Sequence, residues 1–199
     1  MQDETKLTID YYNRNAKSFT QDTVAAGMDV VRQQFLKYIP IDGLILDLGC
    51  GSGRDSKAFL DAGYKVVMID GSEELCKIAE KLTGQKAACC LFQTYRPDEI
   101  FDGIWACSSL LHLKKTEIHD VVKRLAQNLR QGGCFYMSFK YGTFSGERNG
   151  RYFTDFTAAG IAHLFSDLPG LCLINKNITN DVRPGRENEK WLNLYYKKL

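Results

Sequence analysis

"LILDLGCGSGRDS" (residues 44–56) places an apolar run directly before an acid and three closely spaced glycines. The run from Leu44 to Leu46 predicts a buried strand, which the glycines must end. Glycine at such a place usually marks a sharp turn of the backbone or the close approach of another group. The stretch therefore predicts a strand, a bend that leaves room for a ligand, and then a helix.

From residue 44 onward, strand-like and helical segments alternate. Helices are expected over residues 52–62, over 72–82 with Gly84 closing the helix, over 116–129 with Thr116 as its cap and Gly132 and Gly133 ending it, and over 157–165. Strands are expected over residues 44–48, 64–69, 86–92, 101–107 and 134–139. Two further strand-like segments, 171–178 and 191–196, are joined by a polar loop that contains Pro184 and Gly185, which predicts a hairpin. Such alternation is typical of an α/β fold with a doubly wound, mostly parallel sheet and helices on both faces.

Composition narrows the class of protein. The 199 residues are 44% hydrophobic and 25% charged with a net charge of +2, which fits one globular domain and gives no reason to expect a nucleic-acid surface. No run approaches the ~20 apolar residues of a membrane span, and the acidic start is unlike a secretion signal. Seven cysteines, an odd number without a C-x-x-C pair, predict free thiols in a reducing cytoplasm and no metal site.

An acidic residue just before the bend favours some classes of ligand over others. The glycines follow a G-x-G-x-G spacing, and Arg54 stands where a dinucleotide motif has its third glycine. Asp47, two residues before Gly49, would repel a pyrophosphate and attract a sulfonium or an ammonium group. We therefore expect S-adenosylmethionine (AdoMet) rather than NAD.

A second acid supports a nucleoside ligand. Asp70 ends the second predicted strand, 17 residues beyond Gly53, where a carboxylate accepts hydrogen bonds from ribose hydroxyls. NAD and AdoMet sites share this feature, so Asp70 does not choose between them. The alternative is that Asp70 forms a turn before Gly71.

Several motifs together resemble the class I AdoMet-dependent methyltransferases: residues 47–53, Asp70, "FDGIWACSSLLHL" (101–113) and "LRQGGCFYMSF" (129–139). The resemblance implies a Rossmann-like, seven-stranded sheet of order 3-2-1-4-5-7-6, with strand 7 antiparallel. It implies one methyltransferase domain over residues 1–199, in which 1–40 form a helical cap over the cofactor site and 41–199 form the core.

The N-terminal segment adds a narrower likeness. "YYNRNAKSF" (11–19) resembles small stand-alone bacterial members of the family, including the tellurite-resistance-like type. Tyr11 or Tyr12 would then line the methyl-donor pocket; the alternative is that both pack the first helix on the domain. The expected cofactor-binding residues are Tyr11, Tyr12, Asp47, Gly49, Cys50, Gly51, Gly53, Asp70, Gly71, Phe92, Gln93 and Ser108.

His112 is the candidate catalytic residue. It follows the fourth predicted strand, where an imidazole could take a proton from the acceptor near neutral pH. The alternative is that His112 hydrogen-bonds a neighbouring backbone group and shapes the loop.

The segment "FKYGTFSGERNGRYF" (139–153) reads as a long loop at the end of the fifth strand, where binding loops are common. Lys140, Tyr141 and Arg151, with Arg186 from the hairpin loop, would meet an anionic acceptor. A solvated surface is the alternative, because acids lie among these bases.

The expected function is methyl transfer from AdoMet to a small molecule, with S-adenosylhomocysteine as product. DNA is disfavoured because residues 107–110 lack the prolines of amino-methylating DNA enzymes. An RNA or protein acceptor, a non-catalytic AdoMet-binding role and the oligomeric state are left open.

Overall fold

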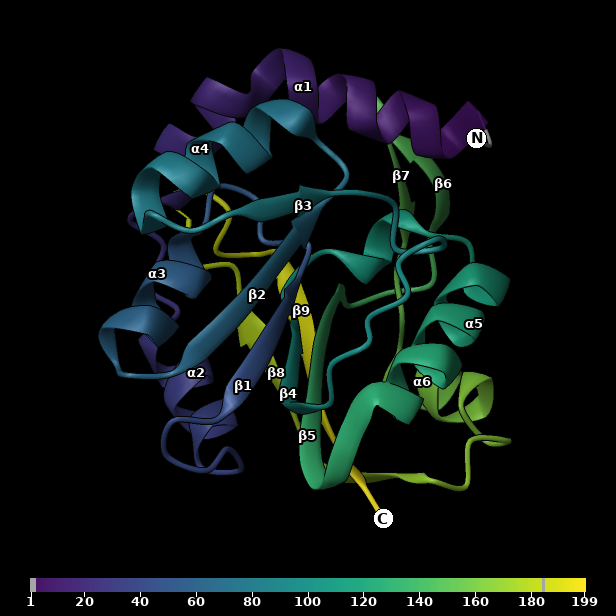
Figure 1. Cartoon of the computed structure of the whole chain (residues 1–199). Helices are drawn as coiled ribbons and strands as arrows, with labels where there is room; N and C mark the ends of the chain where they lie inside the picture. The colour runs from purple at the N-terminus through teal and green to yellow at the C-terminus, as the bar shows by residue number, and fades with distance from the viewer. Residues whose placement is uncertain (1–2, 184) are drawn as a thin grey trace.

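A computed structural model describes residues 3–183 and 185–199, and its centre is a seven-stranded sheet (Figure 1). The strand order is β3-β2-β1-β4-β5-β9-β8. The strands are β1 (Leu44–Leu48), β2 (Lys65–Asp70), β3 (Ala87–Cys89), β4 (Phe101–Ala106), β5 (Leu129–Lys140), β8 (Leu171–Asn180) and β9 (Lys190–Lys198). The first five are parallel and β9 is antiparallel to both β5 and β8. The predicted order 3-2-1-4-5-7-6 is thereby confirmed, with β8 and β9 as its sixth and seventh strands.

Helices cover both faces of the sheet (Figure 1). A hydrophobic core lies on each face, and successive residues of a strand contribute to the two cores in turn. On β1, Ile45 packs with Phe35 of α2 (Asp29–Leu36) and Phe59 of α3 (Arg54–Asp61). The next residue, Leu46, belongs to the opposite core, which includes Ile118 of α5 (Lys115–Leu125). Side chains of successive strand residues point to opposite faces, so a strand buried on both sides must be apolar throughout.

The helix α4 (Glu73–Thr83) shows how local sequence sets an element's ends. The Ser72 hydroxyl accepts a hydrogen bond from the Leu75 N–H at 3.2 Å, which satisfies one of the unpaired donors of the first turn. Gly84 follows the last turn in the left-handed conformation, as the sequence predicts. Because Ser72 lies two residues after Asp70, the last residue of β2, the N-terminus of α4 lies close to Asp70.

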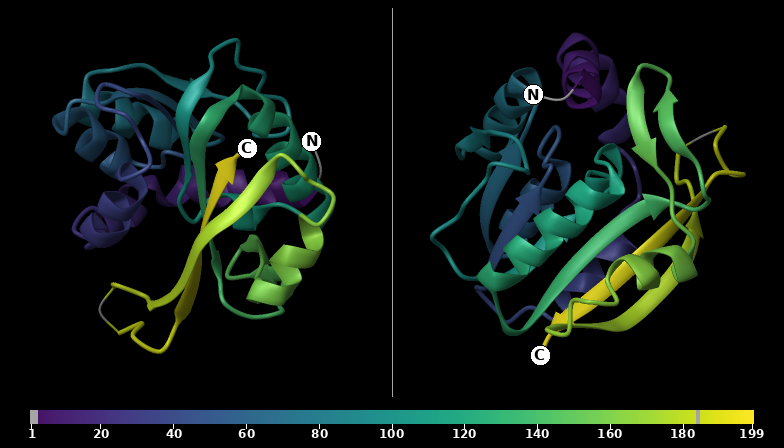
Figure 2. Two further views of the ribbon diagram at one scale, coloured as in Figure 1. Left: turned by 90° about the horizontal axis from the view of Figure 1, so that it is seen from below. Right: turned by 90° about the vertical axis from the view of Figure 1, so that its right-hand side faces the viewer.

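The N-terminal helix α1 (Asp3–Thr23) lies across the carboxyl-end edge of the sheet (Figure 1). It packs against α4 and against β7 (Arg151–Thr154), a strand from much later in the chain. Figure 2 shows α1 beside the two-stranded hairpin that β7 forms with β6 (Ser145–Arg148). Residues 1 and 2, which the expected cap includes, and Pro184 lie outside the described residues.

The structure corrects the expected loop over residues 139–153. Its second half is the β6–β7 hairpin, which turns at Asn149 and Gly150. Both turn residues have positive φ, 52° and 74°, as a two-residue hairpin turn of the primed type requires. The sequence contained this signal, because Asn-Gly between strand-like segments is typical of such a turn.

A second correction concerns Gly132 and Gly133, which were expected to end a helix. Helix α5 ends at Leu125, a 3-10 turn, η2 (Ala126–Asn128), follows, and both glycines lie within β5. The register between β4 and β5 shifts here, and Gly132 has a φ of 81°. The glycines therefore form an irregularity in the strand rather than a helix cap.

One further expectation is also revised. The residue that precedes α5 is Lys114, so Thr116 does not cap that helix. Helix α6 (Ala158–Leu164) is capped by Thr157, whose side chain accepts from the Gly160 N–H at 3.1 Å. Among the described residues, no helix has the length and apolar character that crossing a membrane requires.

Candidate functional site

The bend after β1 is held against the end of β2. The backbone N–H groups of Gly49 and Cys50 both donate to the Ile69 carbonyl oxygen at 2.9 Å. Gly49 has a φ of 88°, and a Cβ there would lie 2.4 Å from the Ser109 Cβ. A residue with a side chain is therefore excluded both by conformation and by space.

Gly53 serves a different purpose. It has a φ of 82° and precedes the first residue of α3, and a Cβ there would lie 3.0 Å from the Ala79 Cα of α4. It lets these two helices approach closely and does not line the cavity described below.

Asp47 lies on the buried end of β1. Its side chain accepts a hydrogen bond from the Ser56 hydroxyl at 2.5 Å, and the residue is 2% exposed. Burial, and next the nearby Asp55 carboxylate, raise the pKa of Asp47 to about 7. A positively charged group beside Asp47 would stabilise the carboxylate, and a phosphate would not.

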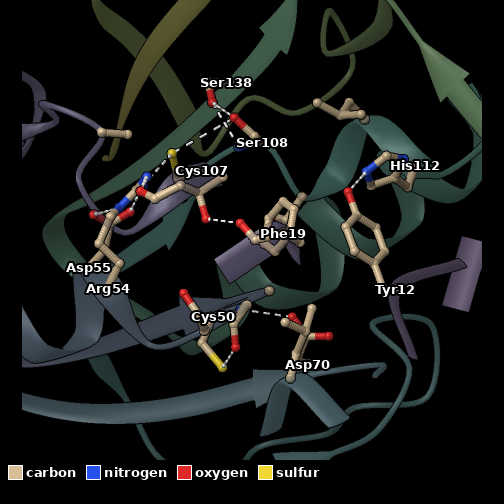
Figure 3. Close-up of a pocket in the computed structure, with 18 of the residues that line it drawn as sticks. Tyr12, Phe19, Cys50, Arg54, Asp55, Asp70, Cys107, Ser108, His112 and Ser138 are labelled. Atoms are coloured by element: carbon tan, nitrogen blue, oxygen red, sulfur yellow. Dashed lines mark hydrogen bonds and ion pairs between the residues drawn. The ribbon is translucent and has the colours of Figure 1, made fainter. Parts of the chain in front are cut away.

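Asp70 lies at the end of β2, next to the bend (Figure 3). Its two carboxylate oxygens accept hydrogen bonds from the N–H groups of Gly51 at 2.9 Å and Ser72 at 2.8 Å. Burial raises the pKa of Asp70, and these bonds oppose the rise. Each carboxylate oxygen has two lone pairs, so Asp70 forms its turn and still has acceptor capacity for a ligand.

A buried ion network supports the floor of the site. Arg54 donates to both carboxylate oxygens of Asp55 at 3.0 and 2.7 Å. Arg32 of α2 and the indole N–H of Trp105 complete the network with bonds to Asp55 of 2.6 and 3.0 Å. Burial raises the pKa of Asp55, but its two arginine partners reverse that effect and hold it below the usual range. Sequence reasoning missed this role of Arg54.

These groups surround a cavity of about 420 Å³ at the carboxyl ends of the strands, beneath α1. It takes in most of the residues that the sequence singled out, but Tyr11, Gly53 and Tyr141 are not part of its lining. Those that line it are Tyr12, Asp47, Gly49, Cys50, Gly51, Asp70, Gly71, Phe92, Gln93, Ser108, His112, Lys140, Arg151 and Arg186.

The wall beside β3 carries Phe92 and Gln93. The Gln93 side-chain nitrogen donates to Glu117 of α5 at 3.0 Å, which leaves the Gln93 carbonyl oxygen as an acceptor. An acceptor beside an aromatic ring is suited to the exocyclic amine of adenine.

At the end of β4, Ser108 has a φ of 54°, a rare value for a residue with a side chain. Its N–H donates to the Ser138 hydroxyl at 2.8 Å, so the neighbouring strand β5 holds this conformation (Figure 3). Ser138 also lines the cavity, and no signal in the sequence marks it.

Tyr12 and His112 point toward one another across the cavity wall (Figure 3). His112 belongs to the short 3-10 turn η1 (Leu110–His112), and its Nδ1 lies 2.7 Å from the Tyr152 carbonyl oxygen. Since a carbonyl only accepts, Nδ1 carries the proton, and Nε2 accepts from the Tyr12 hydroxyl at 2.8 Å. Burial and, less strongly, the charge of Arg151 lower the pKa of His112 to about 4. The imidazole is therefore neutral, with both nitrogens engaged.

The expected anion-binding residues divide into two groups. Lys140 pairs with Glu189 and lies over the Trp191 ring, and Tyr141 is 42% exposed outside the cavity. Arg151 and Arg186 line the cavity together with Arg183.

The described residues fit AdoMet. A cationic amino-acid end suits the buried Asp47, ribose hydroxyls suit Asp70, and the glycine bend leaves the space that a Cβ would fill. In fold and site the chain is similar to the class I AdoMet-dependent methyltransferases, and known proteins show the same likeness. Residues 45–133 match the family model described as "Methyltransferase domain". This match covers less than half of the chain.

Among proteins with curated descriptions, the chain is similar to "Putative methyltransferase YqeM" of Bacillus subtilis (strain 168). The two are 33% identical over 113 residues, which make up 51% of this chain and 46% of the relative. The chain thus matches less than half of that relative's length. The narrower likeness to tellurite-resistance-like enzymes stays a prediction.

Two solved structures share the fold. One is the Burkholderia thailandensis 1,6-didemethyltoxoflavin-N1-methyltransferase with bound 1,6-didemethyltoxoflavin and S-adenosylhomocysteine, at a TM-score of 0.73 and 19% identity, covering 96% of this chain and 84% of that one. The other is the DhpI-SAM-HEP complex, at a TM-score of 0.74 and 17% identity, covering 99% of both chains.

Proposed function

We propose that this protein transfers a methyl group from AdoMet to a small-molecule acceptor. The observation that carries the proposal is the placement of two carboxylates, the buried Asp47 and the half-buried Asp70, around the glycine bend in one cavity. Both have raised pKa values. This pairing suits a ligand that carries an ammonium group and ribose hydroxyls.

The cofactor-binding residues have distinct proposed roles. Asp47 would pair with the ammonium group, Asp70 would accept from the ribose hydroxyls, and Phe92 and Gln93 would meet the adenine. AdoMet supplies an activated methyl carbon, whose bond to sulfur breaks as the acceptor's lone pair attacks, and the bonding pair stays on sulfur. The protein's task is then to align the acceptor and exclude water.

We propose that His112 does not act as a general base in methyl transfer. Its Nε2 already accepts a hydrogen bond from the Tyr12 hydroxyl, and its lowered pKa of about 4 makes it a weak base at neutral pH. Its proposed role is to hold the Tyr12 hydroxyl in one orientation in the cavity wall. The tyrosine oxygen also accepts a hydrogen bond from Arg151 at 3.3 Å.

Helix α1 forms a cover over the cavity, which favours a small acceptor. Helix α1 covers the cavity and is fastened by the Thr8 hydroxyl, which accepts from the Tyr152 N–H at 3.1 Å, and by the bond between Tyr12 and His112. An ion pair of 2.8 Å between Glu4 and Lys114 adds a third attachment. We also propose that the protein works in a reducing cytoplasm, since its seven cysteines are free thiols.

The first test is calorimetric titration with S-adenosylhomocysteine and, separately, with NAD. We expect saturable binding of the first alone, and tighter binding of NAD would refute the cofactor assignment. Asp70→Asn should weaken S-adenosylhomocysteine binding about 10- to 100-fold, because a hydrogen bond to a charged group is lost. Asp61→Asn, which changes an exposed carboxylate of α3, is the matched control and should bind as the wild type does.

The second test identifies the acceptor class. The protein is incubated with AdoMet and cell extract fractionated by size, and the S-adenosylhomocysteine formed is measured in each fraction. Activity in the small-molecule fraction is expected. Activity confined to the RNA or protein fraction would refute the small-molecule acceptor, and activity in no fraction would refute methyl transfer.

A further inference from the structure

Arg151, the first residue of β7, carries a positive charge that no described carboxylate balances. No Asp or Glu among residues 3–183 and 185–199 lies within ion-pair distance of its guanidinium group. Its Nη1 donates to the Tyr12 hydroxyl at 3.3 Å, and its Nε is buried without a hydrogen-bond partner. The group has five N–H donors, so most of them are unused.

Aromatic rings hold this guanidinium group in place. Its central carbon lies 4.3 Å from the ring centroid of Tyr11, 5.1 Å from that of Phe153 and 5.5 Å from that of Tyr12. Stacking of this kind fixes the plane of the guanidinium group but supplies no negative charge. Tyr11, which does not line the main cavity, therefore acts by holding Arg151.

Arg151 also lines a second, smaller cavity of about 60 Å³ between α1 and the β8–β9 connection. Arg183 and Arg186 line it from that connection, and Tyr11, Asn15 and Ser18 supply polar groups from α1. Since a water molecule needs about 10–15 Å³ on this measure, the space holds a few water molecules and suits a carboxylate or phosphate group.

The other arginines of this small cavity have acidic partners. Arg183 donates two hydrogen bonds to Asp181, at 2.8 and 2.5 Å, and Asp22, which also lines the cavity, acts on its charge. Arg186 lies 3.7 Å from Glu189, which also pairs with Lys140. The unbalanced charge of the cluster therefore belongs to Arg151.

We propose that Arg151, assisted by Arg186, binds an oxyanion group of the methyl acceptor in the small cavity. The rest of the acceptor then lies in the main cavity, which Arg151 and Arg186 also line. The acceptor class is a small molecule with a carboxylate or phosphate group apart from its reacting atom. This inference rests on the proposed function, and it moves the anion away from Lys140 and Tyr141, where the sequence placed it.

The test is a titration of the protein, with and without S-adenosylhomocysteine, with inorganic phosphate and with acetate at constant ionic strength. The melting temperature and the heat of binding are both measured. We expect saturable binding of at least one anion, and the stronger of the two shows whether the acceptor group is a phosphate or a carboxylate. Absence of saturable binding of either anion overturns the proposal.

Variants locate the anion. Arg151→Gln should weaken anion binding about tenfold or more, since a charge-assisted pair is lost, while S-adenosylhomocysteine affinity stays within about threefold. Arg151→Lys keeps the charge without the planar fork and should retain part of the binding. Arg14→Gln is the matched control, because Arg14 is an exposed arginine of α1 that lines neither cavity.

Two outcomes contradict the proposal: anion affinity unchanged in Arg151→Gln, or an equal loss in Arg14→Gln, which would indicate a general charge effect. Circular dichroism of each variant shows whether it is folded, and Arg186→Gln offers a second variant if Arg151→Gln is not. Failure of the proposed function would look different: the wild-type protein would bind the anion but would not bind S-adenosylhomocysteine.

Discussion

Alanine at Gly49 would separate the two reasons for glycine in the bend. Gly49 and Gly63 share a φ of 88°, but their surroundings differ. A Cβ at Gly49 would lie 2.4 Å from the Ser109 Cβ and 3.0 Å from a Phe92 ring carbon, whereas a Cβ at Gly63 would meet nothing within 4 Å. The pair therefore holds backbone strain constant and varies only the space.

Gly63→Ala should lower the free energy of unfolding by about 1–2 kcal/mol, the cost of a side chain in the left-handed region. Gly49→Ala adds overpacking of about 1–3 kcal/mol and should cost about 2–5 kcal/mol in total. The Ser109 hydroxyl donates to the Leu48 carbonyl oxygen at 2.6 Å, so Ser109 is held in place and cannot yield without losing that bond.

Urea unfolding without ligand, followed by circular dichroism, measures both losses. Calorimetry with S-adenosylhomocysteine then measures binding, which should weaken in Gly49→Ala and stay unchanged in Gly63→Ala. Equal losses of stability in the two variants would refute the reasoning, because the contact with Ser109 would then carry no cost.

Three further predictions concern charged and titrating groups. Because the pKa of Asp47 is raised to about 7, S-adenosylhomocysteine affinity should rise about tenfold from about pH 5.5 to about pH 7 as the carboxylate ionises, and calorimetry of Asp47→Asn should show no such rise. The pKa of His112 is lowered to about 4, so the stability it contributes is present above about pH 6.5 and lost as the pH falls toward 4. Nitrogen NMR should show a neutral Nδ1–H ring at pH 7, and a protonated ring would contradict this. Asp55→Asn leaves buried arginines without their carboxylate and should lower the free energy of unfolding by about 3 kcal/mol in urea, a loss below 1 kcal/mol being the contrary result.

The sheet was predicted well because its buried strands appear in the sequence as short apolar runs. The apolar run before Asp47 and the alternation of helices and strands can be recognised without knowing which strands pair. The β6–β7 hairpin was also readable in principle, since Asn149 and Gly150 supply its turn. The irregularity at Gly132 and Gly133 was not, because it depends on the register with β4, which only the folded sheet defines.

The structure brings most of the residues expected to bind the cofactor into one cavity and divides those expected to bind an anion, and the reason is distance along the chain. Asp47, Gly49 and Asp70 lie at the ends of adjacent strands, so topology alone brings them together. Arg151 and Arg183 lie on different elements, and the tyrosine that holds Arg151 comes from α1. No local pattern reports which arginines keep a carboxylate partner, and the proposed anion site depends on that distinction.

Because α1 is held by contacts with β7, it can dock in its final place only late in the synthesis of the chain. Thr8 and Tyr152 are 144 residues apart, and Tyr12 and His112 are 100 apart. At a translation rate of about 5–20 residues per second, Tyr152 of β7 is added roughly 7–30 s after Thr8 of α1. A nascent chain stalled before residue 154 therefore carries the glycine bend but an undocked first helix, and the cavity gains its cover only late in elongation.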